Sequence, residues 1–140
     1  MTRNILSIIA GLCCSFIIVL MLEGINHALN PLPDNIGVHD LQSFKDHIES
    51  TSIGLQLPVL ISYAIGTFCG SLITTLIAKN KKMAKAITVG GILMGLGMYN
   101  LVSLQYSAWV SIISFIVFLP AAYLGGKVGL RFSKKSRPIH

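Results

Sequence analysis

Glu23 and His27 are the two side chains in this sequence whose spacing most clearly allows chemistry. Four residues apart on a helix, a carboxylate and an imidazole share one face, and Asn26 lies beside them. Glu23 comes about 18 residues into an apolar run, or about 27 Å along a helix at 1.5 Å per residue. It therefore falls near the edge of a roughly 30 Å hydrocarbon core, and Asn100 of a later apolar segment is expected at a similar height.

Ionisable groups at membrane depth are costly, and they are often functional. Glu23, Asn26, His27 and Asn100 are therefore candidates for a ligand, proton or ion site. The alternatives are an ordinary interfacial carboxylate that is hydrogen-bonded to Asn or Tyr, and a metal site. At the membrane boundary a carboxylate still reaches water, so the position alone does not choose between these readings.

Two further sets of residues have side chains that can bind metal ions: a group of His and Asp residues, and the three cysteines. His39, Asp40, Asp46 and His47 lie in one polar segment, and their spacing matches no standard zinc pattern. We therefore expect them to be solvated loop residues rather than a metal site.

The three cysteines, Cys13, Cys14 and Cys69, all lie inside apolar runs. We expect them to be small packing residues, with a metal or redox site as the alternative. Nucleotide-binding loops, G-x-S-x-G, H-E-x-x-H and Ser/His/Asp spacings are absent from the sequence. We therefore expect no catalytic residues, no cofactor and no enzymatic activity.

The composition indicates the environment in which these residues lie. Of 140 residues, 53% are hydrophobic and 11% are charged, and the mean hydropathy is +0.72. An ordinary soluble domain carries about 25% charged residues. This composition argues against a soluble enzyme and, despite the net charge of +6, against a nucleic-acid-binding protein. It favours an integral membrane protein whose first partner is the lipid bilayer.

Apolar runs and helix breakers predict an all-α membrane protein with one four-helix domain over residues 1–140. The expected spans are about 5–29, 58–78, 84–104 and 108–124, with an outer loop at 30–57 and a basic tail at 127–140. Arg3 and the apolar run after it resemble a signal peptide, but the run is 18 residues long and no small-x-small cleavage site follows it. We expect this run to be a retained first helix.

Charge is segregated along the chain. All five acids lie between residues 23 and 49, and ten of the eleven Lys and Arg residues lie elsewhere, at the two ends and between spans two and three. Basic residues near span ends are retained in the cytoplasm. An even number of spans then places both termini inside and the acidic loop outside, in a bacterial inner (cytoplasmic) membrane.

The outer loop contains one candidate helix, over residues 39–49. Asp40 is a suitable N-cap, and Leu41, Phe44 and Ile48 fall on one face. We expect a short amphipathic helix between spans one and two.

Small residues spaced by four are the signature of close helix packing in membranes. They are Ser62, Gly66, Gly70 and Thr74 in span two, and Gly91 and Gly95 in span three. We expect a shared seam between spans two and three, with a contact between two copies of the chain as the alternative.

The order of these features resembles an uncharacterised family of small bacterial four-span inner-membrane proteins. The segments that carry the resemblance are Arg3-Asn4-Ile5-Leu6, Pro31-Leu32-Pro33, Gly66-Thr67-Phe68-Cys69-Gly70 and Pro120-Ala121-Ala122-Tyr123-Leu124-Gly125-Gly126-Lys127. The resemblance covers most of the chain and implies a four-span fold. It implies no substrate and no functional residue.

The sequence contains many small-residue motifs for helix packing and none of the catalytic spacings named above. It therefore predicts a non-enzymatic interaction or accessory subunit, in a membrane protein complex or a homo-oligomer. The alternative is a small oligomeric transporter or channel with a polar vestibule near Glu23 and His27.

Overall fold

The computed structural model describes residues 2–29, 31, 42–43, 46, 53–103 and 108–135. Four long helices make up this part of the chain: α1 (Thr2–Leu29), α3 (Ile53–Ile77), α4 (Lys82–Ser103) and α5 (Ala108–Lys135). Each is long and apolar enough to cross a membrane. The prediction of an all-helical chain with four potential membrane spans is therefore confirmed. The loop helix expected over 39–49 falls where only residues 42, 43 and 46 are described.

Two helices extend beyond the spans expected from the sequence. α3 begins at Ile53, so Pro58 lies inside the helix instead of opening it. As the sixth residue of α3, Pro58 removes one backbone hydrogen bond near the amino end of the helix. α5 continues to Lys135, so residues 127–135 of the expected basic tail are helical. Pro120 lies inside α5 and does not end it.

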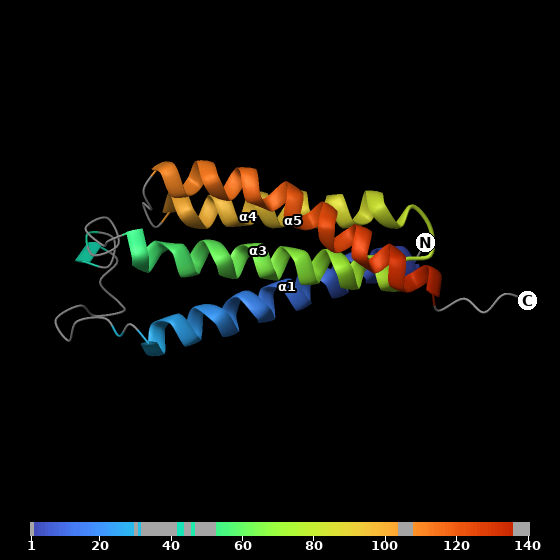
Figure 1. The fold of residues 1–140 in the computed structure, drawn as a ribbon, viewed down its shortest axis with the longest axis horizontal. Helices are drawn as coiled ribbons and strands as arrows, with labels where there is room; N and C mark the ends of the chain where they lie inside the picture. Colours follow the sequence, from blue (N-terminus) through green and yellow to red (C-terminus); the bar gives the residue numbers. More distant parts are fainter. Residues whose placement is uncertain are drawn as a thin grey trace, which may run out of the picture.

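α3 is the central helix of the bundle. It packs against α1 on one side and against both α4 and α5 on the other, while α4 and α5 also pack against each other (Figure 1). α1 and α4 touch only slightly. As a result, α1 depends on α3 for most of its contacts with the rest of the protein.

α1 is attached to α3 through small residues that let the two backbones approach closely. The buried residues of α1 are Ser7, Gly11 and Ser15, which recur every four positions. A Cβ atom at Gly70 would lie 2.6 Å from the carbonyl oxygen of Gly11, and a Cβ atom at Gly11 would lie 2.7 Å from the carbonyl oxygen of Gly70. The Ser15 hydroxyl also donates a hydrogen bond to the Gly66 carbonyl oxygen at 2.9 Å. We call this contact the α1–α3 seam.

The seam therefore differs from the one expected between spans two and three. A Cβ atom added at Gly91 or Gly95 of α4 would meet no atom within 4 Å. The buried face of α4 carries other residues, which are Ala86, Val89, Gly90, Gly97 and Leu101. Gly91 and Gly95 lie off that face, because helical periodicity turns them away from it.

α5 uses the same kind of contact on the opposite side of α3. A Cβ atom at Gly129 would lie 2.8 Å from the carbonyl oxygen of Leu72, and Gly125 lies against the backbone of Phe68. Between α4 and α5, Gly90 faces Ala122 and Gly97 faces the ring of Phe118. Close backbone contacts thus join α3 to α1 on one side and to α5 on the other.

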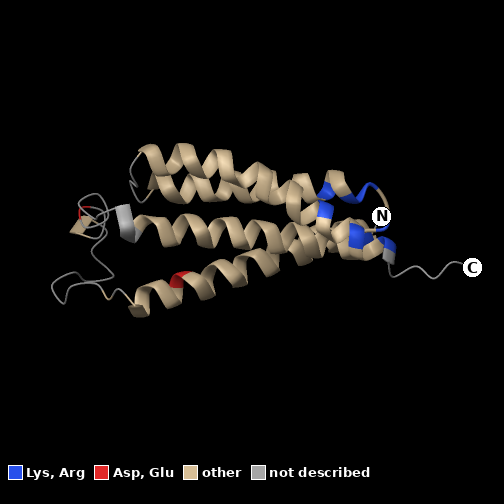
Figure 2. Cartoon of the chain, viewed as in Figure 1, with Lys and Arg blue, Asp and Glu red and all other residues tan. Residues whose placement is uncertain are grey.

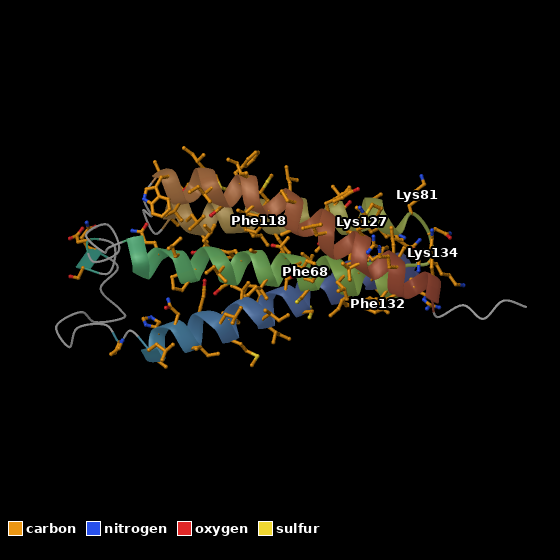
Figure 3. The ribbon with its side chains drawn as sticks, viewed as in Figure 1. Phe68, Lys81, Phe118, Lys127, Phe132 and Lys134 are labelled. Carbon is orange, nitrogen blue, oxygen red and sulfur yellow. The ribbon has the colours of Figure 1, made fainter. Side chains whose placement is uncertain are left out.

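The interior contains many small polar side chains, whereas many large apolar ones point outward. The buried polar residues are Ser7, Ser15, Gln56, Ser62, Thr67, Ser71, Thr74, Thr75 and Ser114. Several of the hydroxyl groups donate to the carbonyl one turn earlier, as Thr74 does to Gly70 at 2.8 Å. Exposed Leu, Ile and Phe side chains surround the bundle (Figure 3). This distribution suits a bundle surrounded by lipid.

The described Lys and Arg residues gather at one end of the bundle, where α1 begins and α5 ends (Figure 2). We call it the basic end, and the opposite end, where α1 ends and α3 begins, the loop end. At the basic end, Lys82 donates to the Ser133 hydroxyl and Arg3 donates to the carbonyl oxygen of Ile77 at 3.4 Å.

Gly70→Ala tests the α1–α3 seam, with Gly95→Ala as its matched control. The added methyl group at position 70 collides with the α1 backbone, so we expect the unfolding free energy in mild detergent to fall by about 2 kcal/mol or more. At position 95 the methyl group meets open space, and alanine favours the helix by about 1 kcal/mol. Equal destabilisation by the two variants would contradict the seam.

Candidate functional site

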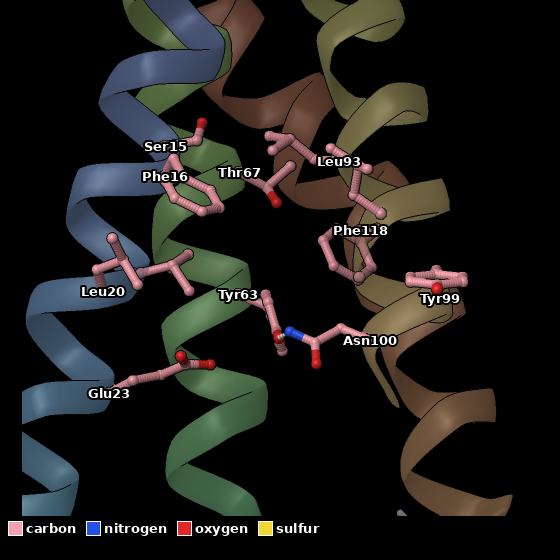
Figure 4. A pocket seen from close by; sticks show the side chains of 13 residues that line it. Ser15, Phe16, Leu20, Glu23, Tyr63, Thr67, Leu93, Tyr99, Asn100 and Phe118 are labelled. Carbon is pink, nitrogen blue, oxygen red and sulfur yellow. Dashed lines mark hydrogen bonds between the residues drawn. The ribbon is translucent and has the colours of Figure 1, made fainter. Parts of the chain in front are cut away.

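A cleft opens between α1 and α4, with α3 and α5 behind it (Figure 4). It holds a cavity of about 260 Å³. Its lining residues are Ser15, Phe16, Val19, Leu20, Glu23, Tyr63, Thr67, Leu93, Leu96, Gly97, Tyr99, Asn100 and Phe118. We call it the α1–α4 cleft. It exists because α1 rests on α3 and scarcely reaches α4.

The cleft continues toward the basic end as an entirely apolar cavity of about 370 Å³. That second cavity is lined by Leu12, Cys13, Phe16, Ile17, Leu93 and Leu96. Phe16, Leu93 and Leu96 border both cavities. The two together form an elongated apolar groove that runs beside α1 from Leu12 to Glu23.

A hydrogen-bond network crosses the cleft near the loop end. The side-chain amide of Asn100 on α4 donates to the Tyr63 hydroxyl oxygen on α3 at 3.1 Å. The half-buried Glu23 carboxylate on α1 faces the Tyr63 side chain across the cleft. The Tyr63 ring lies 5.8 Å, centroid to centroid, from the buried ring of Phe118 on α5. Tyr63 thus joins α3 to α4 by a hydrogen bond and to α5 by ring packing, with the carboxylate of α1 opposite.

Local sequence explains why these groups meet. Tyr63 and Thr67 are one turn apart on α3, so both face the cleft. On α1, Ser15, Val19 and Glu23 recur every four residues, which extends the α1–α3 seam toward the loop end as a row of larger side chains. These larger side chains lie where α1 diverges from α3 toward the loop end (Figure 1), and the cleft opens beside them.

The structure brings together two of the four predicted ligand-site residues. Glu23 and Asn100 both line the cleft, and Tyr63 lies between them. Asn26 and His27 do not line it, although His27 interacts electrostatically with Glu23. Among the predicted packing residues, Gly66 and Gly70 belong to the α1–α3 seam, whereas a Cβ atom added at Gly91 or Gly95 would meet no atom within 4 Å.

The other candidates remain separate from the cleft network. Cys13, Cys14 and Cys69 are free thiols. No group of three or more metal-ligating side chains occurs within the described residues. His39, Asp40 and His47 lie outside those residues, so the structure does not describe them.

The lining of the cleft has the composition of a ligand site. The cleft offers one carboxylate, a hydroxyl and an amide at its polar end, and rings and aliphatic chains over the remaining length. Ligand sites have this character: a mostly apolar lining with a few convergent polar groups. The described lining contains no nucleophile with an adjacent base, because Ser15 and Thr67 lie among backbone carbonyl groups and apolar side chains.

Comparison with protein-family models, curated proteins and solved structures finds no match to this chain.

Tyr63→Phe tests the network, with Tyr99→Phe as its matched control. Removing the Tyr63 hydroxyl breaks its bond with Asn100, while the ring keeps its contact with Phe118. We expect the unfolding free energy in mild detergent to fall by about 1 kcal/mol. Tyr99 is 75% exposed, and its variant should change stability by less than about 0.5 kcal/mol.

A double-mutant cycle with Asn100→Leu adds a second readout. The paired variants should destabilise by less than the sum of the single ones, since both remove the same bond. Strict additivity would contradict the network.

Proposed function

We propose that this chain is a non-enzymatic membrane protein that acts by binding, as an interaction or accessory subunit does, and that the α1–α4 cleft is its binding site. The single observation that carries the proposal is an apolar groove that ends at one carboxylate network. The occupant enters sideways from the bilayer, because the groove is bounded by two membrane-length helices that scarcely touch.

The size of the groove decides what kind of occupant fits. Its two cavities hold about 260 and about 370 Å³ and share three lining residues. Ligand pockets of roughly 300–1,000 Å³ accept molecules of drug or acyl-chain size. A membrane helix, about 10 Å wide, is too broad for such a groove. The proposed partner is therefore a small amphiphile.

The alternative role, an oligomeric transporter or channel with a vestibule near Glu23 and His27, uses the same groove. Toward the basic end of the groove, the α1 and α3 backbones are in close contact at Gly11 and Gly70. The groove is polar only at its other end, near Glu23. A groove with one polar and one apolar end suits binding better than the passage of ions. We therefore favour binding.

We also propose that the chain lies in a bacterial inner membrane with both termini in the cytoplasm, as in the four-span family that it resembles. The support is the gathering of the described basic residues at one end of the bundle. Lys and Arg beside membrane spans remain on the cytoplasmic side. Glu23 and the cleft network then lie toward the outer face.

Binding of radiolabelled dodecanol tests the groove as a site. The probe is an uncharged alkyl chain, and the protein is the full chain in phosphatidylcholine nanodiscs, with empty nanodiscs subtracted. We expect saturable binding near one probe per chain. Leu93→Trp adds an indole to the wall that both cavities share, and it should weaken binding by at least about fivefold.

Ile92→Trp is the control for this experiment. Ile92 is exposed, and neither cavity is lined by it. Its variant should bind dodecanol as the wild type does. Linear, unsaturable uptake by the wild type would contradict the proposed site.

Thiol labelling tests the orientation. In a variant with Cys13, Cys14 and Cys69 replaced by Ser, single cysteines are placed at the exposed residues Asp46 and Lys134. A membrane-impermeant maleimide should label Asp46→Cys in intact cells and Lys134→Cys only after permeabilisation, because basic ends stay inside. The reverse pattern would contradict the proposed orientation.

A further inference from the structure

We propose that the guest of the α1–α4 cleft is a lipophilic monocation, an alkyl or aryl body whose single ammonium-type group lies beside Glu23. This inference rests on the proposed function and gives the chemical class of the ligand. Its geometric basis is the position of one carboxylate at the end of an apolar groove.

Charge complementarity is the first argument. Glu23 is the one carboxylate in the described lining of the cleft, and no Lys or Arg belongs to that lining. The described Lys and Arg residues lie at the basic end, which is the far end of the bundle (Figure 2). A half-buried carboxylate in an apolar site attracts a cation more strongly than the same group in water. The site therefore favours a positive guest.

The surroundings of Glu23 are the second argument. Asn100 donates its amide hydrogen to the Tyr63 oxygen, and the Tyr63 side chain faces the Glu23 carboxylate (Figure 4). These neighbours are neutral, so they do not neutralise the charge of the carboxylate. A cationic guest beside Glu23 supplies the opposite charge.

Aromatic rings are the third argument. Tyr63, Tyr99 and Phe118 line the cleft, and Phe16 lies where the cleft meets the apolar cavity (Figure 4). A cation within about 6 Å of such a ring centroid is attracted by the ring face. Aromatic rings are a usual means by which proteins recognise quaternary ammonium groups.

The length of the groove provides room for the body of the guest. From Glu23 to Leu12, the lining of α1 extends about 16 Å at 1.5 Å per residue. The basic-end cavity is lined only by apolar side chains and Cys13. An unbranched alkyl chain or a flat aryl group suits such a lining.

A zwitterionic lipid headgroup fits less well than a free monocation. A phosphate beside the ammonium group would meet Glu23 and find no Lys or Arg in the described lining. Like charges at that distance repel in a site of low polarity. His27, one turn nearer the loop end, is the titratable neighbour of Glu23 and lies outside the cleft. We therefore commit to a cation that carries no anionic group.

The test compares two probes with the same alkyl chain, dodecyltrimethylammonium and dodecanol, on the full chain in phosphatidylcholine nanodiscs. Equilibrium binding is measured after subtraction of empty nanodiscs. The wild type should bind the cation at least about tenfold more tightly than the alcohol. Glu23→Gln should remove this preference, and saturable binding of dodecanol by the variant reports that it is folded.

Asp46→Asn is the matched control for charge. Asp46 is an exposed carboxylate outside the cleft, hydrogen-bonded by Gln42 at 3.2 Å. Its variant should keep the full preference for the cation. An excess of dodecylphosphocholine, which has the same cation joined to a phosphate, should not displace the bound dodecyltrimethylammonium.

The possible failures are distinguishable. Saturable dodecanol binding with no preference for the cation would overturn the monocation and leave the binding site intact. An unchanged preference in Glu23→Gln, or an equal loss in Asp46→Asn, would also overturn it. Displacement by dodecylphosphocholine would identify a lipid headgroup instead and overturn the free cation. Saturable binding of neither probe would overturn both proposals.

Discussion

Close contact between the α1 and α3 backbones determines most of what is distinctive in this structure. In lipid no hydrophobic force presses one helix onto another, so dispersion contacts and hydrogen bonds between close backbones must hold them. Gly11 and Gly70 allow that approach, and Ser15 adds a bond to the Gly66 carbonyl oxygen. Because this seam uses one face of α1, the face of α1 that borders α4 makes few contacts with it. The α1–α4 cleft follows from that one attachment.

The polar groups at the loop end follow from the same geometry. Where the seam gives way to larger side chains, Glu23 extends from α1 toward α3 and meets Tyr63, and Asn100 completes the network from α4. A carboxylate at this depth is expensive unless it is hydrogen-bonded. Polar side chains of Tyr63 and Asn100 face the carboxylate, and the apolar groove ends at this acidic group. Shape and charge in the cleft thus have a common origin in how α1 is attached.

Sequence patterns predicted the four helices and which residues lie at the same depth along them. They did not predict which helix faces pack against each other. Apolar runs and prolines identify spans in a single chain, and the distance of Glu23 from Ile5 placed it level with Asn100. Gly66–Gly70 and Gly91–Gly95 have the same spacing, so spacing alone paired them with each other. The structure pairs the first with Gly11 and leaves the second open. The walls of the cleft, Leu93 and Leu96, look in sequence like any lipid-facing leucines.

The most direct test of the account is an experimental structure of the full chain in lipid nanodiscs, at a resolution that shows side chains. The account predicts that α1 touches α3 through Gly11 and Gly70 and stays apart from α4, with an elongated molecule between Phe16 and Leu93 whose polar end lies at Glu23. A structure in which α1 packs along α4 and closes the groove would contradict it.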